Sequence, residues 1–533
     1  NLLGYPRFFF FKSVSSVKKY MYMQVRASII FLILFPFLQV LKAQDLKGVK
    51  EFYQNNEHTL LKEYFAFLSL PNTFNDRAKL EDNAAFILKM MQDAGIKSQL
   101  LYDKDKKCVP VVFGEVLQPK ATKTILFYAH YDGQPVNPSN WSAGLEPFKP
   151  QLLSDRLDRG GKFVDFPSPG GTFDPAWRIY GRSSADDKAG VFSIIKAYEA
   201  IIKNGLLPEI NIKFFFEGEE ENGSVNLEAI LEHNKDILKG DLWVICDGPM
   251  PASGQKQITF GVRGDVNMHL TVYGPKRPLH SGNYGNWAPN PAHKLTRLLA
   301  SMKDDDGKVL IDGYYDDVVP LSEEENQAIR EIEDPGPVLQ AELGFSAAET
   351  KGKHFLESII SIPTLNINGF SAANTGRLAS NIIPTTASAA LDLRLVKGNT
   401  VTGQVNRVLD HIRKMGYHIV TEEPTDEERM KYPNIIFVAT GKGYPAQRTP
   451  MNLPLAKKIA AAIQQTSDKK IVLMPSAGGS LPLYLFENVS GIYPVTIPVV
   501  NYDNNQHAEN ENLLLGKLSD GIQSMASVMM YKY

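Results

Sequence analysis

A strand that ends in a cluster of glutamates constrains the fold of this chain more than any other feature. The largely apolar run Ile210–Phe216 predicts a buried β-strand, and Glu217, Glu219, Glu220 and Glu221 follow it directly. Adjacent carboxylates at the end of a buried strand are costly unless a cation compensates their charge. Two interpretations are therefore open: a solvated acidic turn, which is the commoner origin of a short charge run, or a metal site.

Histidines and aspartates stand at the ends of other predicted elements. The predicted strands are Thr124–Tyr128, Asp241–Cys246 and Tyr493–Val499, and a buried helix is predicted over Ala189–Ile202. The polar residues at these ends are His130, Asp132, Asp186, Asp247 and His507. Taken singly, each has an ordinary explanation as a structural histidine or a helix-capping carboxylate. In an open α/β sheet, however, ligands bind beyond the carboxyl ends of the strands, and this combination suits a dinuclear, zinc-type centre.

The order of the predicted elements divides the chain into two domains. Alternating strands and helices over residues 45–257 and 441–533 predict an α/β domain with a doubly wound, mostly parallel sheet. Residues 258–440 differ: Asp265–Tyr273 alternates apolar and polar residues, as a half-exposed antiparallel strand does. We therefore predict an inserted, smaller α+β domain of ferredoxin-like type. Within it, Asp304–Lys353 is acidic and partly helical, which predicts a surface excursion.

Composition narrows the choice of ligand. A chain of 533 residues exceeds what one hydrophobic core usually organises, and 43% apolar with 22% charged residues is typical of a globular protein. The net charge of −2 gives no reason to expect nucleic acid or an anionic membrane as a partner. Cys108 and Cys246 are the only cysteines and do not constitute a disulfide framework. We expect a small ligand.

The N-terminal region predicts export. Residues 23–44 combine a basic start at Arg26, an apolar run over Ile29–Leu38 and Ala43 just before Asp45. This is the pattern of a secretory signal peptide. The apolar run is short for a bilayer span, so a membrane anchor is the weaker alternative. The expected location is periplasmic or secreted, without stable membrane insertion.

Six motifs, in order, relate the chain to a known enzyme family. They are HYDGQPV at His130, YGRSSADDKAG at Tyr180, EGEEENGS at Glu217, CDG at Cys246, LHSGNYG at Leu279 and QHAENE at Gln506. With them the chain resembles the dinuclear zinc metallopeptidases that include carnosinase, cytosolic nonspecific dipeptidase, aminoacylase and glutamate carboxypeptidase, over nearly all of residues 60–530. Residues 314–325 resemble the carnosinase and nonspecific dipeptidase branch in particular.

The resemblance implies a set of metal ligands. By residue-by-residue matching, Asp186 would bridge two divalent ions, expected to be zinc, with manganese or cobalt as alternatives. His130 and Asp247 would complete the ligands of one ion, and Glu221 and His507 those of the other. A carboxylate suits the bridging position because it has two oxygen atoms.

The resemblance also implies catalytic residues near these ligands. Glu220 matches the general base, and Asp132 matches the residue that braces the histidine side of the centre. Choosing Glu220 over Glu219 depends on aligning the family's glutamate pair before the glycine turn. His280, in the inserted domain, matches a histidine that stabilises the oxyanion.

Three further residues match substrate contacts. They are Asn381, Ser480 and Arg394, and a guanidinium such as that of Arg394 can grip a free carboxylate with two parallel hydrogen bonds. In dimeric relatives His280 and Asn381 would reach into the other subunit's site. The resemblance therefore implies a homodimer and makes the inserted domain a dimerisation or lid domain.

The expected function is a secreted, metal-dependent exopeptidase of dipeptidase or carboxypeptidase type that acts on dipeptides or short peptides. Three departures from the family pattern bear on this expectation: Ala477 replaces an acidic residue, Ser183 replaces a glycine, and the loop Asp155–Trp177 is longer than usual. Because Ala477 removes a partner for a substrate's free amino group, an aminoacylase or related amidohydrolase acting on N-acyl amino acids is the main alternative. A non-catalytic binding protein on this fold is a remote one.

Overall fold

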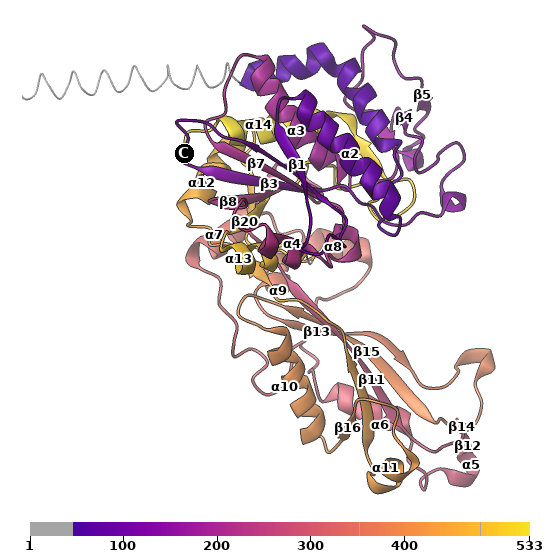
Figure 1. Cartoon of the computed structure of the whole chain (residues 1–533). Helices are drawn as coiled ribbons and strands as arrows, with labels where there is room; N and C mark the ends of the chain where they lie inside the picture. Colours follow the sequence, from indigo (N-terminus) through magenta and orange to yellow (C-terminus); the bar gives the residue numbers. More distant parts are fainter. Residues whose placement is uncertain (1–45, 351, 480) are drawn as a thin grey trace, which may run out of the picture.

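A computed structural model describes residues 46–350, 352–479 and 481–533 of the chain. It contains an α/β domain and an elongated second domain inserted into it (Figure 1). The predicted signal peptide over residues 23–44 and the predicted substrate contact Ser480 lie outside the described residues. Among the helices of the described ranges, none is both long and apolar enough to cross a bilayer.

The α/β domain is built on an eight-stranded sheet with the order β1-β2-β7-β3-β8-β20-β9-β19. Its strands are β1 (Lys97–Leu101), β2 (Val111–Val116), β3 (Thr124–His130), β7 (Asn211–Glu217), β8 (Leu242–Ile245), β9 (Gln257–Thr259), β19 (Val472–Met474) and β20 (Pro494–Thr496). The central strands β7, β3, β8 and β20 run parallel, whereas β1 and β2 join them in antiparallel pairs. The predicted doubly wound, mostly parallel sheet is confirmed.

Helices cover both faces of this sheet (Figure 1). One face carries a helix over residues 46–68, α2 (Arg77–Asp93), α3 (Lys188–Lys203), α12 (Pro454–Gln464) and α14 (Leu515–Met530), and the other carries α4 (Leu227–His233) and α13 (Tyr484–Ser490). The phenylalanines of β7 divide accordingly: Phe214 and Phe216 join the first core, and Phe215 joins the second. Burial on both faces explains why this strand is apolar without alternation.

The inserted domain contains a five-stranded sheet with the order β13-β15-β11-β17-β16. Its strands are β11 (Gly264–Tyr273), β13 (Thr364–Ser371), β15 (Thr386–Leu395), β16 (His418–Val420) and β17 (Ile435–Thr440). Helices α6 (Pro291–Ala300) and α10 (Val401–Lys414) pack against it around a separate core. The succession β11-α6-β13-β15-α10-β17 is the ferredoxin-like arrangement that the sequence predicts.

Smaller elements connect and extend the domains. The two chain connections between them pair as β10 (Gly261–Val262) and β18 (Gln447–Arg448). The predicted excursion holds α7 (Glu323–Glu331) and α8 (Gly336–Leu343), and α9 (Phe355–Ile360) follows; α7 contacts β19 of the α/β domain. The predicted domain boundaries at residues 257 and 440 stay predictions; the first falls inside β9 of the eight-stranded sheet, and the second coincides with the end of β17.

Two small sheets lie near the motifs. The first has the order β21-β6-β4-β5, with β4 (Gln151–Leu153), β5 (Phe163–Val164), β6 (Arg178–Tyr180) and β21 (Asn512–Leu514). It brings the segments before Asp186 and after His507 side by side, although they are far apart in the sequence. The second pairs β12 (Leu279–His280) with β14 (Ile382–Ile383) at the end of the inserted domain remote from the α/β domain (Figure 1). Next to it is α5 (Ser281–Tyr284), and α11 (Asp426–Lys431) lies at the end of β11, where Arg429 Nη2 donates to the backbone oxygen of Gly274 at 2.8 Å.

Candidate metal centre

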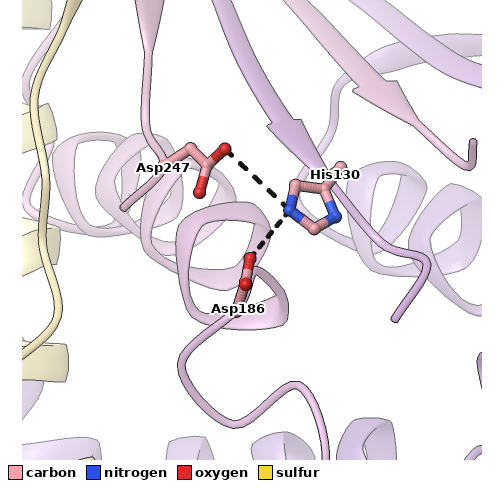
Figure 2. A group of neighbouring side chains, drawn as sticks. All are labelled: His130, Asp186 and Asp247. Atoms are coloured by element: carbon pink, nitrogen blue, oxygen red, sulfur yellow. Dashed lines mark hydrogen bonds and ion pairs between the residues drawn. The ribbon is translucent and has the colours of Figure 1, made fainter. Parts of the chain in front are cut away.

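The structure brings His130, Asp186 and Asp247 together at the carboxyl edge of the large sheet. His130 ends β3, Asp247 follows β8, and Asp186 precedes α3. His130 Nε2 lies 2.9 Å from Asp186 Oδ1 and 4.0 Å from Asp247 Oδ2. Figure 2 shows both carboxylates directed toward this one ring nitrogen. All three residues are buried, so their side chains form a preassembled ligand group.

A second group shares Asp186 with the first. His507 Nε2 lies 3.1 Å from Asp186 Oδ2 and 3.2 Å from Glu221 Oε2. The two oxygen atoms of Asp186 therefore face two different histidines, one from each group. Within each group, one ligand atom per residue lies within 4.8 Å of the others. This is the arrangement that a carboxylate bridging two cations requires.

The electrostatics of the centre fit divalent cations. Burial raises the pKa of Asp247 to about 6, and it raises the pKa of Glu220 well above the usual range. Hydrogen bonds to Asp186 and Glu221 raise the pKa of His507 to about 10. Asp186 differs from these carboxylates, because its hydrogen bonds with His130 and His507 lower its pKa in spite of burial. Imidazole nitrogen and carboxylate oxygen together suit zinc, manganese or cobalt.

Asp132 braces both the histidine and the glutamate turn. Its carboxylate is fully buried, and Oδ1 lies 3.3 Å from His130 Nδ1. The same carboxylate accepts hydrogen bonds from the backbone N–H of Glu220 at 3.2 Å and of Glu221 at 2.9 Å. It therefore orients the imidazole and fixes the glutamate turn relative to β3, as partners of metal ligands commonly do.

The four glutamates within residues 217–221 occupy different environments. Glu220 Oε2 lies 3.9 Å from His130 Nε2, beside the first ligand group. Glu219 instead accepts two hydrogen bonds from Asn226, at 3.0 and 2.9 Å, and one from the backbone N–H of Val109. Glu217 is buried and accepts a hydrogen bond from a tyrosine hydroxyl at 2.7 Å. The solvated-turn interpretation is therefore wrong for Glu217, and Glu220 rather than Glu219 faces the centre.

Two glutamines that were not predicted as site residues also contact the candidate ligands. Gln134 Nε2 donates to Glu221 Oε2 at 2.9 Å, and Gln506 Nε2 donates to Asp186 Oδ2 at 2.9 Å. Both residues lie inside motifs already used to identify the family, HYDGQPV and QHAENE. Because these motifs also contain the candidate ligands His130 and His507, the motifs could have indicated that the two glutamines lie at the site.

Asn72 links the loop after β3 to the loop before α3 through hydrogen bonds. No pattern in the sequence predicts this role. Asn72 is fully buried, and its Nδ2 donates to the backbone oxygen of Tyr131 at 2.8 Å and to Ser183 Oγ at 2.9 Å. Ser183 has φ of +60°, a conformation in which glycine is favoured. Ser183, which replaces the family's glycine, therefore accepts a hydrogen bond from Asn72 that a glycine could not accept.

The remaining predicted residues lie apart from the ligand groups. His280 and Asn381 are neighbours, since the N–H of Ser281 donates to the backbone oxygen of Asn381 at 2.9 Å, but they lie at the remote end of the inserted domain (Figure 1). Arg394 lies on β15, and its Nε lies 3.1 Å from Asp392 Oδ2. One chain alone does not bring His280 and Asn381 to the centre.

The sequence matches a known family over most of its length. The profile of Peptidase family M20/M25/M40 matches residues 126–531. The Cys-Gly metallodipeptidase DUG1 of Candida albicans is 26% identical over 487 residues, covering 87% of this chain and 92% of that protein. The Beta-Ala-His dipeptidase of Homo sapiens is 26% identical over 430 residues, covering 79% and 77%.

Solved structures agree with this assignment. The M20 family metallo-carboxypeptidase Sso-CP2 from Sulfolobus solfataricus has a TM-score of 0.69 at 27% identity, covering 88% of this chain and 98% of that chain. Human carnosine dipeptidase 1 shares the fold, with a TM-score of 0.67 at 22% identity, covering 91% and 98%. The predicted resemblance to the carnosinase and dipeptidase branch is confirmed, and the chain belongs to Peptidase family M20/M25/M40 and is a metallopeptidase.

Proposed function

We propose that this protein is an exopeptidase that uses two divalent ions to hydrolyse dipeptides or short peptides. The observation that carries the proposal is the position of Asp186, whose two oxygen atoms face His130 and His507 separately. The dipeptidase names of the relatives support the substrate class. His130 and Asp247 would hold one ion, Glu221 and His507 the other, and Asp186 both. When bound, such ions polarise a carbonyl group and promote the ionisation of water.

The side chains of the chain itself supply proton transfer and orientation. Glu220 is half-buried beside the ligands, with its pKa raised by burial, so its carboxylate can accept a proton from the attacking water and deliver it to the leaving nitrogen. Asp132 keeps the backbone of Glu220 in place through a hydrogen bond of 3.2 Å. Arg394 is the candidate partner for the free carboxylate of the substrate.

An amidohydrolase acting on N-acyl amino acids is the second candidate. The observation that favours it is Ala477, which offers no side-chain group to a substrate's amino terminus and whose N–H donates to the backbone oxygen of Gly261 at 2.8 Å. Hydrolysis of a dipeptide and of its N-acetylated form separates the two candidates. Faster turnover of the free dipeptide supports the exopeptidase, and faster turnover of the acetylated form supports the amidohydrolase.

Metal reconstitution tests the shared chemistry. The protein is stripped with a chelator and refilled with zinc, manganese or cobalt, and each form is assayed on a panel of dipeptides and acyl amino acids. We expect no hydrolysis without metal and recovery with at least one of the three ions. Unchanged hydrolysis after stripping would contradict a metal-dependent reaction, and no hydrolysis of any substrate by the refilled protein would favour the binding-protein alternative.

We also propose that the protein is a homodimer whose subunits join through the inserted domain. β13 is an edge strand of the five-stranded sheet, with Ile367 45% and Phe370 50% exposed, and Leu378 nearby is 74% exposed. An exposed apolar edge strand is a template for pairing with a second copy. Sedimentation equilibrium should give twice the chain mass, and Phe370→Lys should shift it toward the monomer. A monomeric wild-type protein would contradict this proposal.

Export to the periplasm or the medium is the last part of the proposal. It is supported by the signal-peptide pattern of residues 23–44. Fractionation of expressing cells followed by N-terminal sequencing tests it. We expect a mature protein that starts near Gln44 or Asp45 in the periplasmic or secreted fraction, and an uncleaved protein in the membrane pellet would contradict it.

A further inference from the structure

Glu511 is a fully buried carboxylate that belongs to neither ligand group. Its Oε1 accepts hydrogen bonds from the backbone N–H of Ala185 at 2.9 Å and of Asp186 at 3.0 Å. Its Oε2 accepts from the backbone N–H of Ser183 at 2.9 Å and from Arg182 Nη1 at 2.8 Å. Four donors thus converge on one carboxylate, and three of them are backbone groups of the turn that leads into Asp186.

The backbone of Glu511 adds a fifth contact to the same turn. The N–H of Gly181 donates to its carbonyl oxygen at 3.0 Å, next to the β21–β6 pairing. The turn over residues 181–186 is therefore wrapped around Glu511 and has little freedom to change shape. Successive backbone N–H groups that surround one anion form a concave anion site, in which the bound carboxylate determines the backbone geometry.

Glu511 also belongs to the loop that carries His507. It lies four residues after that histidine, and β21 begins at the next residue. His507 and Asp186 are ligands of the same group, with Nε2 and Oδ2 separated by 3.1 Å. One side chain therefore links the backbone positions of two ligands that are more than 300 residues apart in the sequence.

We propose that Glu511 is a positioning residue for the metal centre, which holds Asp186 so that its two oxygen atoms face the two ligand groups. It acts through backbone hydrogen bonds and through Arg182, whose guanidinium balances its charge. Outer partners of this kind typically change metal affinity by about 10- to 100-fold when they are replaced.

The substitution Glu511→Gln tests this role with little change in volume. An amide has one oxygen and one NH2 group, so either orientation places a donor against two of the present donors. The turn then has to open or shift, and Asp186 moves with it. Glu509→Gln is the matched control, because Glu509 lies in the same loop but is only half-buried, and its side chain accepts a hydrogen bond from Asn140 Nδ2 at 2.9 Å.

A residue that only stabilises the fold would behave differently. Its replacement would lower the unfolding temperature of the metal-free protein but leave the metal affinity of the folded protein unchanged. Two readouts are therefore needed: zinc affinity, from titration of the zinc-loaded protein with a chelator of known affinity, and thermal unfolding of the chelated protein.

We expect Glu511→Gln to bind zinc about 10- to 100-fold more weakly than the wild type, and Glu509→Gln to match the wild type. Arg182→Lys keeps the carboxylate and the backbone bonds but loses the guanidinium contact, and we expect a smaller, several-fold loss. If Glu511→Gln does not fold, the zinc affinity of Arg182→Lys tests the proposal instead. Wild-type zinc affinity in the folded variants would overturn the proposal.

The inference rests on the metal centre of the proposed function, and the same titration keeps the two claims separate. Absence of zinc binding by the wild-type protein would contradict the metal centre itself. Zinc binding that is equal in the wild type and in Glu511→Gln would contradict only the role of Glu511.

Discussion

At the scale of single residues, neighbouring glutamates differ because their hydrogen-bond partners differ. The carboxylate of Glu219 is held by Asn226, whereas that of Glu220 lies beside His130 and has its pKa raised by burial. A buried carboxylate without strong donors has a high proton affinity, which suits a general base. Glu219 and Glu220 are therefore adjacent residues of the same type in different environments, and only Glu220 is expected to be catalytic.

We predict that Glu220→Gln lowers kcat by about 100- to 10,000-fold, the usual contribution of a general base. The amide cannot accept the proton, but it preserves the shape of the side chain, so metal content should not change. Glu219→Gln, the adjacent control, should retain activity within a few-fold. Steady-state kinetics and metal analysis of both variants check this, and full activity of Glu220→Gln would remove Glu220 from the mechanism.

Asp132 supports a second prediction at this scale. Asp132→Asn replaces one carboxylate oxygen, which contacts His130 or the backbone of the glutamate turn, with an NH2 group that cannot accept a hydrogen bond. Divalent ions should therefore bind about 10- to 100-fold more weakly. Metal retained after dialysis against a chelator measures the effect. The exposed Asp305→Asn variant is the control, and equal retention in both variants would show that Asp132 does not orient the centre.

The gathering of the candidate ligands, and of Asp132 beside them, could be predicted from the sequence, but the position of Asn72 could not. His130, Asp186 and Asp247 follow or precede strongly apolar elements, and the strand order of an α/β sheet brings such ends together. Asn72 lies in an irregular segment, and its partners are separated from it by 59 and 111 residues. No periodicity or spacing indicates contacts of that kind.

At the scale of elements, uninterrupted apolar strands were the easiest to predict. Ile210–Phe216 became β7 with a shift of one residue, because burial on both faces makes the whole strand apolar. The pairing direction of β1 and β2 was not predictable, since an apolar run does not distinguish a parallel neighbour from an antiparallel one. The loop Asp155–Trp177 was predicted as irregular, yet it supplies β5 to a small sheet.

The junction of β9 and α14 supports a prediction about pH. Lys256 Nζ donates to Thr466 Oγ1 at 2.8 Å and to Ser524 Oγ at 2.9 Å, and burial lowers the pKa of Lys256 to about 8. Below pH 8 the lysine is protonated in both the folded and the unfolded state. Between pH 8 and about 10.4 the unfolded state binds more protons, so the free energy of unfolding rises with pH.

We predict that this rise amounts to on the order of 2 kcal/mol between pH 7.5 and 9.5, and that Lys256→Met lacks it. Urea unfolding of both proteins at the two pH values gives the change in the free energy of unfolding for each. Subtracting the change in the variant from that in the wild type removes the contribution of the tyrosines, which both proteins share. A parallel pH dependence in the wild type and the variant would show that Lys256 does not titrate in this range.

At the scale of the whole molecule, β12, which ends at His280, lies at the end of the inserted domain remote from the α/β domain (Figure 1), so His280 could reach a metal centre only in the proposed dimer. The ferredoxin-like order of the inserted domain was predictable from its strand and helix succession. Its position relative to the α/β domain was not, because that position depends on the short β10–β18 connection and on α7 contacting β19.

Mixing two inactive variants tests completion of the sites between subunits. His280→Ala and Glu220→Gln are unfolded and refolded together, or coexpressed, so that subunits combine at random. We expect about a quarter of the wild-type activity, because half of the dimers are mixed and each mixed dimer has one complete site. Each variant refolded alone is the control, and no recovery in the mixture would indicate that each chain contains its whole site.

The proposed dinuclear centre depends on Asp186, the residue that its two ligand groups share. Equilibrium dialysis of the metal-free protein against zinc, followed by metal analysis, tests it most directly. The wild type should bind one ion for each of the two groups, and Asp186→Ala should lose tight binding at both. Binding of a single ion by the wild type, or unchanged binding by Asp186→Ala, would show that Asp186 does not join two metal sites.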